Sequence, residues 1–138
     1  MASVKGVNFT NITADPVVNA DSGEWSGKLR VQFDTFEASS LASGSDISVA
    51  RLPKGAKVYD VAIHHDALGS GVTLAVGDSA DADRYITATA AASAGVISMH
   101  NDGAIGGVGF EQTAETDILI TTGGAAATSN IKCIVFYV

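Results

Sequence analysis

Apolar and polar residues alternate in short runs along most of the chain after residue 27. In LRVQFDTF (29–36), Leu29, Val31 and Phe33 alternate with polar neighbours, which is the period-two pattern of a strand with one buried face and one solvated face. Further strands are predicted at 46–52, 56–65, 72–77, 84–90, 95–100, 117–122 and 131–138, each bounded by Gly, Asp, Asn, Ser or Pro. The chain therefore consists mainly of short strands joined by turns.

One segment competes with this all-β interpretation. The alanine-rich stretch ITATAAASAG at 86–95 is compatible with a short helix that ends at Gly95, but its threonines and its lack of larger apolar residues disfavour that helix. No long helical stripe occurs in the sequence, and eight short strands suffice for two sheets that each bury one face. We therefore predict an all-β fold, an antiparallel β-sandwich or jelly roll that spans residues 27–138 as a single domain.

The first 26 residues have a different character. They are mostly polar, contain Pro16 and Gly23 and show little periodicity, so they predict an extended N-terminal arm at 1–26. The apolar arm residues expected to contact another subunit are Phe9, Ile12, Val17 and Trp25. For Trp25 an alternative role is to anchor the arm onto the domain.

The run from Ile131 to Val138 is nearly all apolar. A strand of this composition must be hidden on both faces, either at the centre of the sandwich or under another subunit. This run is a first indication of assembly.

Composition narrows the choice of partners. The 138 residues are 46% hydrophobic and 17% charged, and they carry a formal net charge of −7. An acidic chain lacks the basic face that phosphate backbones and anionic membranes require, so neither nucleic acid nor a membrane is an expected partner. No signal peptide or membrane span is recognised, and the product is expected to stay soluble where it is made. The lone Cys133 predicts a buried thiol and excludes an intrachain disulfide.

Three aspartates, Asp78, Asp81 and Asp83, lie in the polar stretch VGDSADADRYI at 76–86. Their spacing does not fit an EF-hand loop, which needs a central glycine and a closing glutamate. Aspartates between strands commonly accept hydrogen bonds from nearby backbone amides, so a turn is the preferred interpretation. A looser calcium site at these aspartates stays open as the alternative.

No pattern of catalytic residues is recognised. His64 and His65 are adjacent in a predicted strand and point to opposite faces, so they cannot easily bind one metal ion together. Neither a G-x-S-x-G nucleophile motif nor a phosphate-binding loop occurs. We expect no enzyme activity, no cofactor and no metal site, with a small metal-assisted hydrolase as a minor alternative.

Aromatic residues suggest a third class of function. A sugar-binding face is conceivable if aromatic side chains gather on one surface, and the candidates are Trp25, Phe33, Phe36, Tyr59 and Tyr85. The preferred interpretation places Phe33 and Phe36 in the core.

Four stretches carry a resemblance to a known class of proteins: RVQFDTFEA, ISVARLPKGAKVYDVAI, VGDSADADRYI and IKCIVFYV. Together they resemble small virion structural proteins of tailed bacteriophages, in which an LPKGA-like segment precedes an apolar strand and a GDSADxDRY-type segment follows. The similarity extends from about Arg30 to Val138 and includes no catalytic motif.

The resemblance implies a non-enzymatic particle component made in the host cytoplasm and located in the virion. Capsid decoration or head stabilisation is the first choice, and a tail or fibre-base component is the second. The implied partners are the major capsid protein or another virion protein and further copies of the chain, a trimer being favoured. The resemblance also implies a structured turn in which the aspartates bind backbone amides, Arg84 offsets their charge and Tyr85 returns the chain to the sheet. That turn consists of Asp78, Asp81, Asp83, Arg84 and Tyr85.

Overall fold

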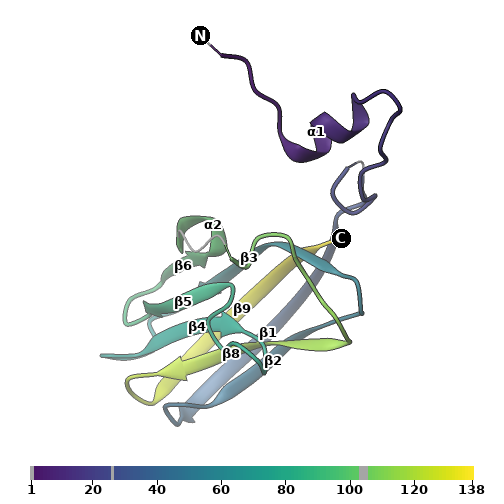
Figure 1. The fold of residues 1–138 in the computed structure, drawn as a ribbon. Helices are drawn as coiled ribbons and strands as arrows, with labels where there is room; N and C mark the ends of the chain where they lie inside the picture. Colours follow the sequence, from purple (N-terminus) through teal and green to yellow (C-terminus); the bar gives the residue numbers. More distant parts are fainter. Residues whose placement is uncertain (1, 26, 103–105) are drawn as a thin grey trace.

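Two antiparallel sheets face each other in the computed structural model, which describes residues 2–25, 27–102 and 106–138 (Figure 1). The first sheet has the order β1 (Arg30–Leu41), β9 (Ala127–Tyr137), β3 (Lys57–His65) and β6 (Gly95–Ser98), and β7 (Phe110–Glu111) also pairs with β3. The second sheet has the order β2 (Asp46–Leu52), β8 (Thr116–Gly123), β4 (Thr73–Gly77) and β5 (Ile86–Ala90). The described helices are short, α1 (Val7–Ile12) and α2 (Met99–Asp102).

The strand order is that of a jelly roll. The first and last strands of the domain pair with each other, and most connections cross from one sheet to the other. This arrangement confirms the predicted antiparallel sandwich and decides between its two forms. The alternative helix at 86–95 is wrong, because this segment contains β5 and the first residue of β6. No helix in the described part of the chain is long and apolar enough to cross a bilayer.

The core lies between the sheets and follows the expected alternation in the central strands. Ile118 and Ile120 of β8 face Val61 and Ile63 of β3 across the sandwich, and all four are fully buried. Each such side chain contributes about 1.5–3 kcal/mol by leaving water. Cys133 of β9 is buried in the same layer, as predicted.

The prediction for the first strand is wrong about which face is buried. Val31 and Phe33 are 58% and 60% exposed, and Phe36 is also exposed. Since β1 pairs only with β9, it is an edge strand, and its inward-facing positions border the opening between the sheets. The polar side chains of Gln32 and Asp34 therefore share the inner face of β1 with Phe36 and the buried Ala38, while Val31 and Phe33 face outward.

Several element boundaries also differ from the sequence prediction. The first strand continues to Leu41, and the last begins at Ala127. The predicted strand at 95–100 ends at Ser98, where α2 begins. Helix α1 and the two-residue strand β7 were not anticipated, because elements this short carry almost no periodic signal.

Burial governs the reactivity of Cys133. Its surroundings exclude water, and Asp34 adds a negative charge nearby, so the pKa of the thiol rises to about 12. We expect no reaction with Ellman's reagent at mildly alkaline pH in the folded protein and stoichiometric reaction after unfolding in urea. Rapid labelling of the native chain would show instead that this part of the core opens readily.

Candidate assembly surfaces

The N-terminal arm projects away from the sandwich (Figure 1). Helix α1 buries none of its residues, and Phe9, Val17 and Trp25 are exposed, whereas Ile12 is half-buried. The structure thus places three of the four expected interface residues in solvent. Their side chains are 46%, 62% and 42% exposed, respectively, for Phe9, Val17 and Trp25.

The root of the arm is fixed to the sandwich by a buried lysine. Lys57 of β3 lies with its Nζ 2.8 Å from Glu24 Oε1, 3.3 Å from Asp21 Oδ2 and 3.9 Å from Glu111 Oε2. Next to it, the Tyr59 hydroxyl donates a hydrogen bond of 2.7 Å to the carbonyl oxygen of Gly23. The side chain of Lys57 is itself 8% exposed, so this cation depends on its acidic partners.

The pKa values of Asp21, Glu24 and Lys57 are shifted by their contacts with one another. Hydrogen bonds with Lys57 lower the pKa of Glu24, and a backbone hydrogen bond from Gly23 together with Lys57 lowers the pKa of Asp21. The hydrogen bond to Glu24 raises the pKa of Lys57 against the effect of burial. The contacts that fix the arm root are therefore this ion cluster and the Tyr59 hydrogen bond, and the Trp25 side chain near them is 42% exposed. Sequence reasoning missed Lys57, because nothing in its neighbourhood marks a buried lysine.

The outer face of the first sheet carries a second uncovered apolar surface. Paired residues on neighbouring strands share a face, so Val31 lies beside Phe136, and Phe33 lies beside Ile134, which in turn lies beside Ala62 of β3. We call this set, Val31, Phe33, Ile134, Phe136 and Ala62, the outer stripe. All of its members are exposed or half-buried.

The outer face of the second sheet is more polar. There Leu119 lies beside Ser48 and Gly77, and Thr121 lies beside Asp46 and Ala75. Leu119 is the large apolar residue among these, and it is half-buried. The apolar character of the outer stripe is therefore a property of one sheet and is not shared by both faces of the sandwich.

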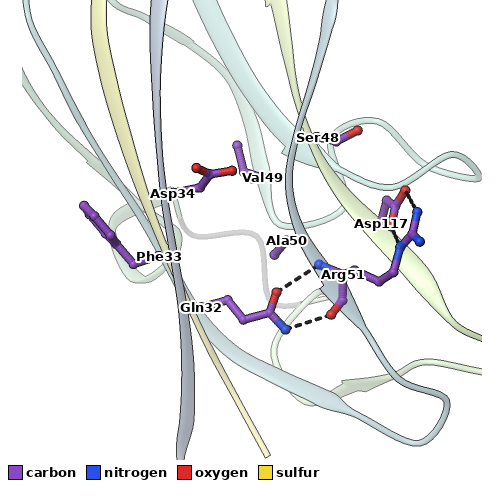
Figure 2. Close-up of a pocket in the computed structure, with 8 residues that line it drawn as sticks. All are labelled: Gln32, Phe33, Asp34, Ser48, Val49, Ala50, Arg51 and Asp117. Atoms are coloured by element: carbon purple, nitrogen blue, oxygen red, sulfur yellow. Dashed lines mark hydrogen bonds and ion pairs between the residues drawn. The ribbon is translucent and has the colours of Figure 1, made fainter.

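A groove of about 620 Å³ runs between the edges of β1 and β2 (Figure 2). Gln32 bridges it: its amide oxygen accepts a hydrogen bond of 2.9 Å from the backbone N–H of Arg51, and its amide nitrogen donates one of 2.7 Å to the carbonyl of Arg51. Figure 2 shows Phe33 directed away from the groove. The inner positions of β1 thus close the sandwich edge with a side-chain amide.

Two of the charged residues along this groove, Arg51 and Asp117, form an ion pair, while Asp34 also lines it. Arg51 makes a bidentate ion pair with Asp117, with donor–acceptor distances of 2.6 and 2.9 Å. These hydrogen bonds lower the pKa of Asp117 and raise that of Arg51. Because both partners are satisfied, the groove offers little to an incoming charged ligand.

The stretch at 76–86 forms a turn built around Asp78. Its buried carboxylate accepts hydrogen bonds of 2.9 and 3.0 Å from the backbone N–H groups of Ala80 and Asp81. Arg84 donates through Nε over 2.7 Å. Burial opposes ionisation of Asp78, but Arg84 and the two backbone N–H groups outweigh it and hold its pKa below the ordinary value of 3.8.

Tyr85 and Arg84 connect this turn to the rest of the domain. The fully buried Tyr85 hydroxyl accepts a hydrogen bond of 2.6 Å from Gln112, and burial raises its pKa to about 12. The Arg84 guanidinium stacks 3.9 Å from the ring centre of Phe110. Gly77 permits the turn, because a Cβ there would overlap the backbone of Asp81.

The other two aspartates play smaller parts. The carbonyl oxygen of Asp81 accepts a hydrogen bond of 2.9 Å from the backbone N–H of Asp78. The side chain of Asp83 is exposed. A hydrogen bond and charge repulsion from Asp81 raise the pKa of Asp83. Within residues 2–25, 27–102 and 106–138, no group of three His, Cys, Asp or Glu side chains is arranged to hold a metal ion.

His64, His65, Tyr59 and Tyr85 do not form a common site. His64 is exposed on the outer face, whereas His65 is buried and makes a 2.9 Å hydrogen bond with the carbonyl of Asp66, so the two point to opposite faces as predicted. The hypothetical sugar-binding face is contradicted for Tyr85, which lies in the core, and Tyr59 is occupied by the arm root.

Solved structures with similar folds come from phage capsids. The chain is similar to one in the "Cyanophage Pam1 capsid asymmetric unit", with a TM-score of 0.64 and 26% identity over 80% of this chain and 84% of that one. It is also similar to a chain in the "Capsid of Ralstonia phage GP4", with a TM-score of 0.65 and 19% identity over 81% and 84%. A chain in the "Acidic stable capsid structure of Helicobacter pylori bacteriophage KHP30" matches with a TM-score of 0.57 and 13% identity over 79% and 86%. No protein-family model matches the sequence, and no curated protein matches it either.

The similarities to the GP4 and KHP30 capsids show a shared fold. The similarity to the Pam1 capsid chain adds sequence identity across most of both chains. By structural similarity, the chain is therefore of the kind found in phage capsids. The resemblance to virion structural proteins suggested by the sequence is supported to that extent.

The ion pair at Asp78 should be essential for stability. Asp78→Ala leaves Arg84 without its partner and two backbone N–H groups without an acceptor, so we expect the free energy of unfolding in urea to fall by about 3–5 kcal/mol at neutral pH. Because the folded pKa lies below the unfolded one, the native chain has this stabilisation above about pH 4 and loses it as the pH falls further. In Asp78→Ala, the free energy of unfolding should therefore fall less steeply below about pH 4 than in the native chain.

The matched control is Asp83→Asn in the same turn. Asp83 is exposed and is repelled by Asp81, so its neutralisation should leave stability unchanged or slightly higher. An equal loss in both variants would contradict the central role of Asp78.

The arm root should detach when its lysine is removed. Lys57→Met leaves Asp21 and Glu24 without their cation, so we expect faster cleavage after Glu24 by a glutamate-specific protease while the sandwich stays folded by circular dichroism. Lys132→Met, an exposed lysine on the neighbouring strand β9, is the control and should not change the cleavage rate. Unchanged cleavage in Lys57→Met would mean that other contacts hold the arm.

Proposed function

We propose that this chain is a non-enzymatic structural protein of a phage capsid, one that binds the outer surface of the shell as an oligomer and stabilises it. The observation that carries the proposal is the similarity to the Pam1 capsid chain, which covers 80% of this chain and combines fold with 26% identity. The jelly-roll topology is compatible with this role, since viral capsid domains use it repeatedly.

The surfaces of the molecule support an assembly role. The arm and the outer stripe both expose apolar side chains, and contiguous uncovered patches of this kind typically mark contacts with other proteins. The polar groups of the 76–86 turn and of the groove at β1 and β2 are instead engaged with each other. Asp78 and Asp117 thus serve the fold, and the apolar surfaces are left for partners.

The net charge favours the outside of the shell. An acidic chain of −7 is repelled by packaged DNA, whose phosphates attract basic proteins. On the outer surface, each copy stabilises the closed lattice by binding it in preference to free shell subunits, and the effect grows with occupancy. The proposed partners are the major capsid protein or another virion protein and further copies of the chain, in a small cyclic oligomer for which we favour a trimer. The proposed location is the virion, after synthesis in the host cytoplasm.

A tail or fibre-base component is the second candidate. The same fold and the same uncovered surfaces suit that position, and the two candidates differ in the number of copies per particle. The carbohydrate-binding alternative is weaker, because two of its five aromatic candidates are engaged inside the molecule.

Copy number tests the proposal directly. Quantitative mass spectrometry is applied to density-purified particles from the source lysate. We expect the copy number of this chain to be close to that of the most abundant shell protein. Only a few copies per particle would move the assignment to the tail or fibre base. Absence from the particles would overturn the virion role altogether.

A further inference from the structure

The two uncovered apolar surfaces of the chain do not meet each other. Residues 6–20 of the arm expose Phe9 and Val17, and the outer stripe exposes Val31 and Phe33, yet α1 stands clear of the sheets (Figure 1). Each copy therefore carries one apolar arm and one apolar stripe, and neither is covered within the monomer. Equal numbers of two complementary surfaces are what a head-to-tail contact between identical chains requires.

Charge identifies a second copy as a suitable occupant. Two chains that each carry −7 repel one another wherever their acidic surfaces approach. The part of the arm that carries α1 avoids this repulsion, since GVNFTNITA at 6–14 contains no charged residue, although Lys5 precedes it and Asp15 follows it. The five side chains of the outer stripe are likewise uncharged, and the charged residues that border it on the same face are Asp60 beside Phe136 and Lys132 next to Ile134 along β9.

The shape of the arm points to the same contact. A helix of six residues is marginal in water and depends on packing for its stability. Phe9 and Ile12 are three residues apart in α1 and lie on one side of it, which provides a small apolar face. The stripe is likewise a small apolar face, in which Val31 and Phe33 lie beside Phe136 and Ile134.

Reach allows the contact to form between neighbours. Nine residue steps separate Ile12 at the end of α1 from Asp21 at the anchored root, and they extend up to about 30 Å. A domain of about 100 residues has a radius of gyration of about 13 Å. Since the root is held by Lys57 at the end of the sheet, the arm is directed outward and away from its own stripe.

We propose that the arm of one copy packs its α1 face, Phe9 and Ile12, against the outer stripe of the next copy, so that successive arms close a ring. The inference rests on the proposed role as an oligomeric capsid protein and names the surface that receives the arm. Such a contact is heterologous, and a ring leaves no arm or stripe uncovered.

Disulfide trapping tests the contact. Phe9→Cys and Phe33→Cys are coexpressed as separate chains that differ in tag size, and the purified mixture is oxidised mildly. The native Cys133 is buried and does not interfere. We expect a covalent heterodimer of the two tagged chains, with a yield at least tenfold above that of Phe9→Cys coexpressed with Leu119→Cys, the matched position on the outer face of the other sheet.

Each result has a definite meaning. Equal yields for Phe33→Cys and Leu119→Cys would overturn the contact, and so would a link from Phe33→Cys to the shell protein alone when the experiment is repeated on particles. Neither outcome affects the copy number in particles, so failure of this inference is separate from failure of the proposed function. Mass measurement of the uncrosslinked protein should show a closed oligomer for the native chain and a monomer for the exposed-site variant Phe33→Asp.

Discussion

Pairing between β1 and β9 determines which side chains of the first sheet face the core and which face outward. The β1–β9 register runs without interruption from Arg30 beside Tyr137 to Ala38 beside Ser129. It places the inner residues of β9, such as Cys133, in the core and the alternate residues of β1, such as Phe33, on the outside. Because β1 has a partner on one side only, its two faces are less buried than those of the central strands. The outer stripe and the groove at the sandwich edge both result from this register.

The same pairing fixes the position of the arm. The chain enters β1 directly after the arm root, so the arm must leave from the edge of the first sheet. Lys57 lies close to this point, and its burial requires acidic partners, which Asp21 and Glu24 supply. The ion pairs of the buried Lys57 thus fix the place where the arm leaves the sandwich.

Acidic residues in this molecule have distinct tasks despite their similar sequence context. Asp78 is buried and saturated by Arg84 and backbone donors, whereas Asp83, five residues later, is exposed and repelled by its neighbour. The contribution of an acidic residue to stability in this turn therefore depends on its burial and on its partners.

The alternating pattern and the spacing of turns were enough to determine the all-β class, the approximate strands and the buried thiol at Cys133, because these depend on local periodicity and composition. The pattern at Leu29, Val31 and Phe33 indicated a two-faced strand correctly, but it contains no information on which face is inward. That choice depends on whether the strand lies at the centre or the edge of its sheet. Likewise, only the tertiary structure brings Lys57 to Asp21 and Glu24, since residues more than 30 positions apart meet through sheet topology and not through local sequence.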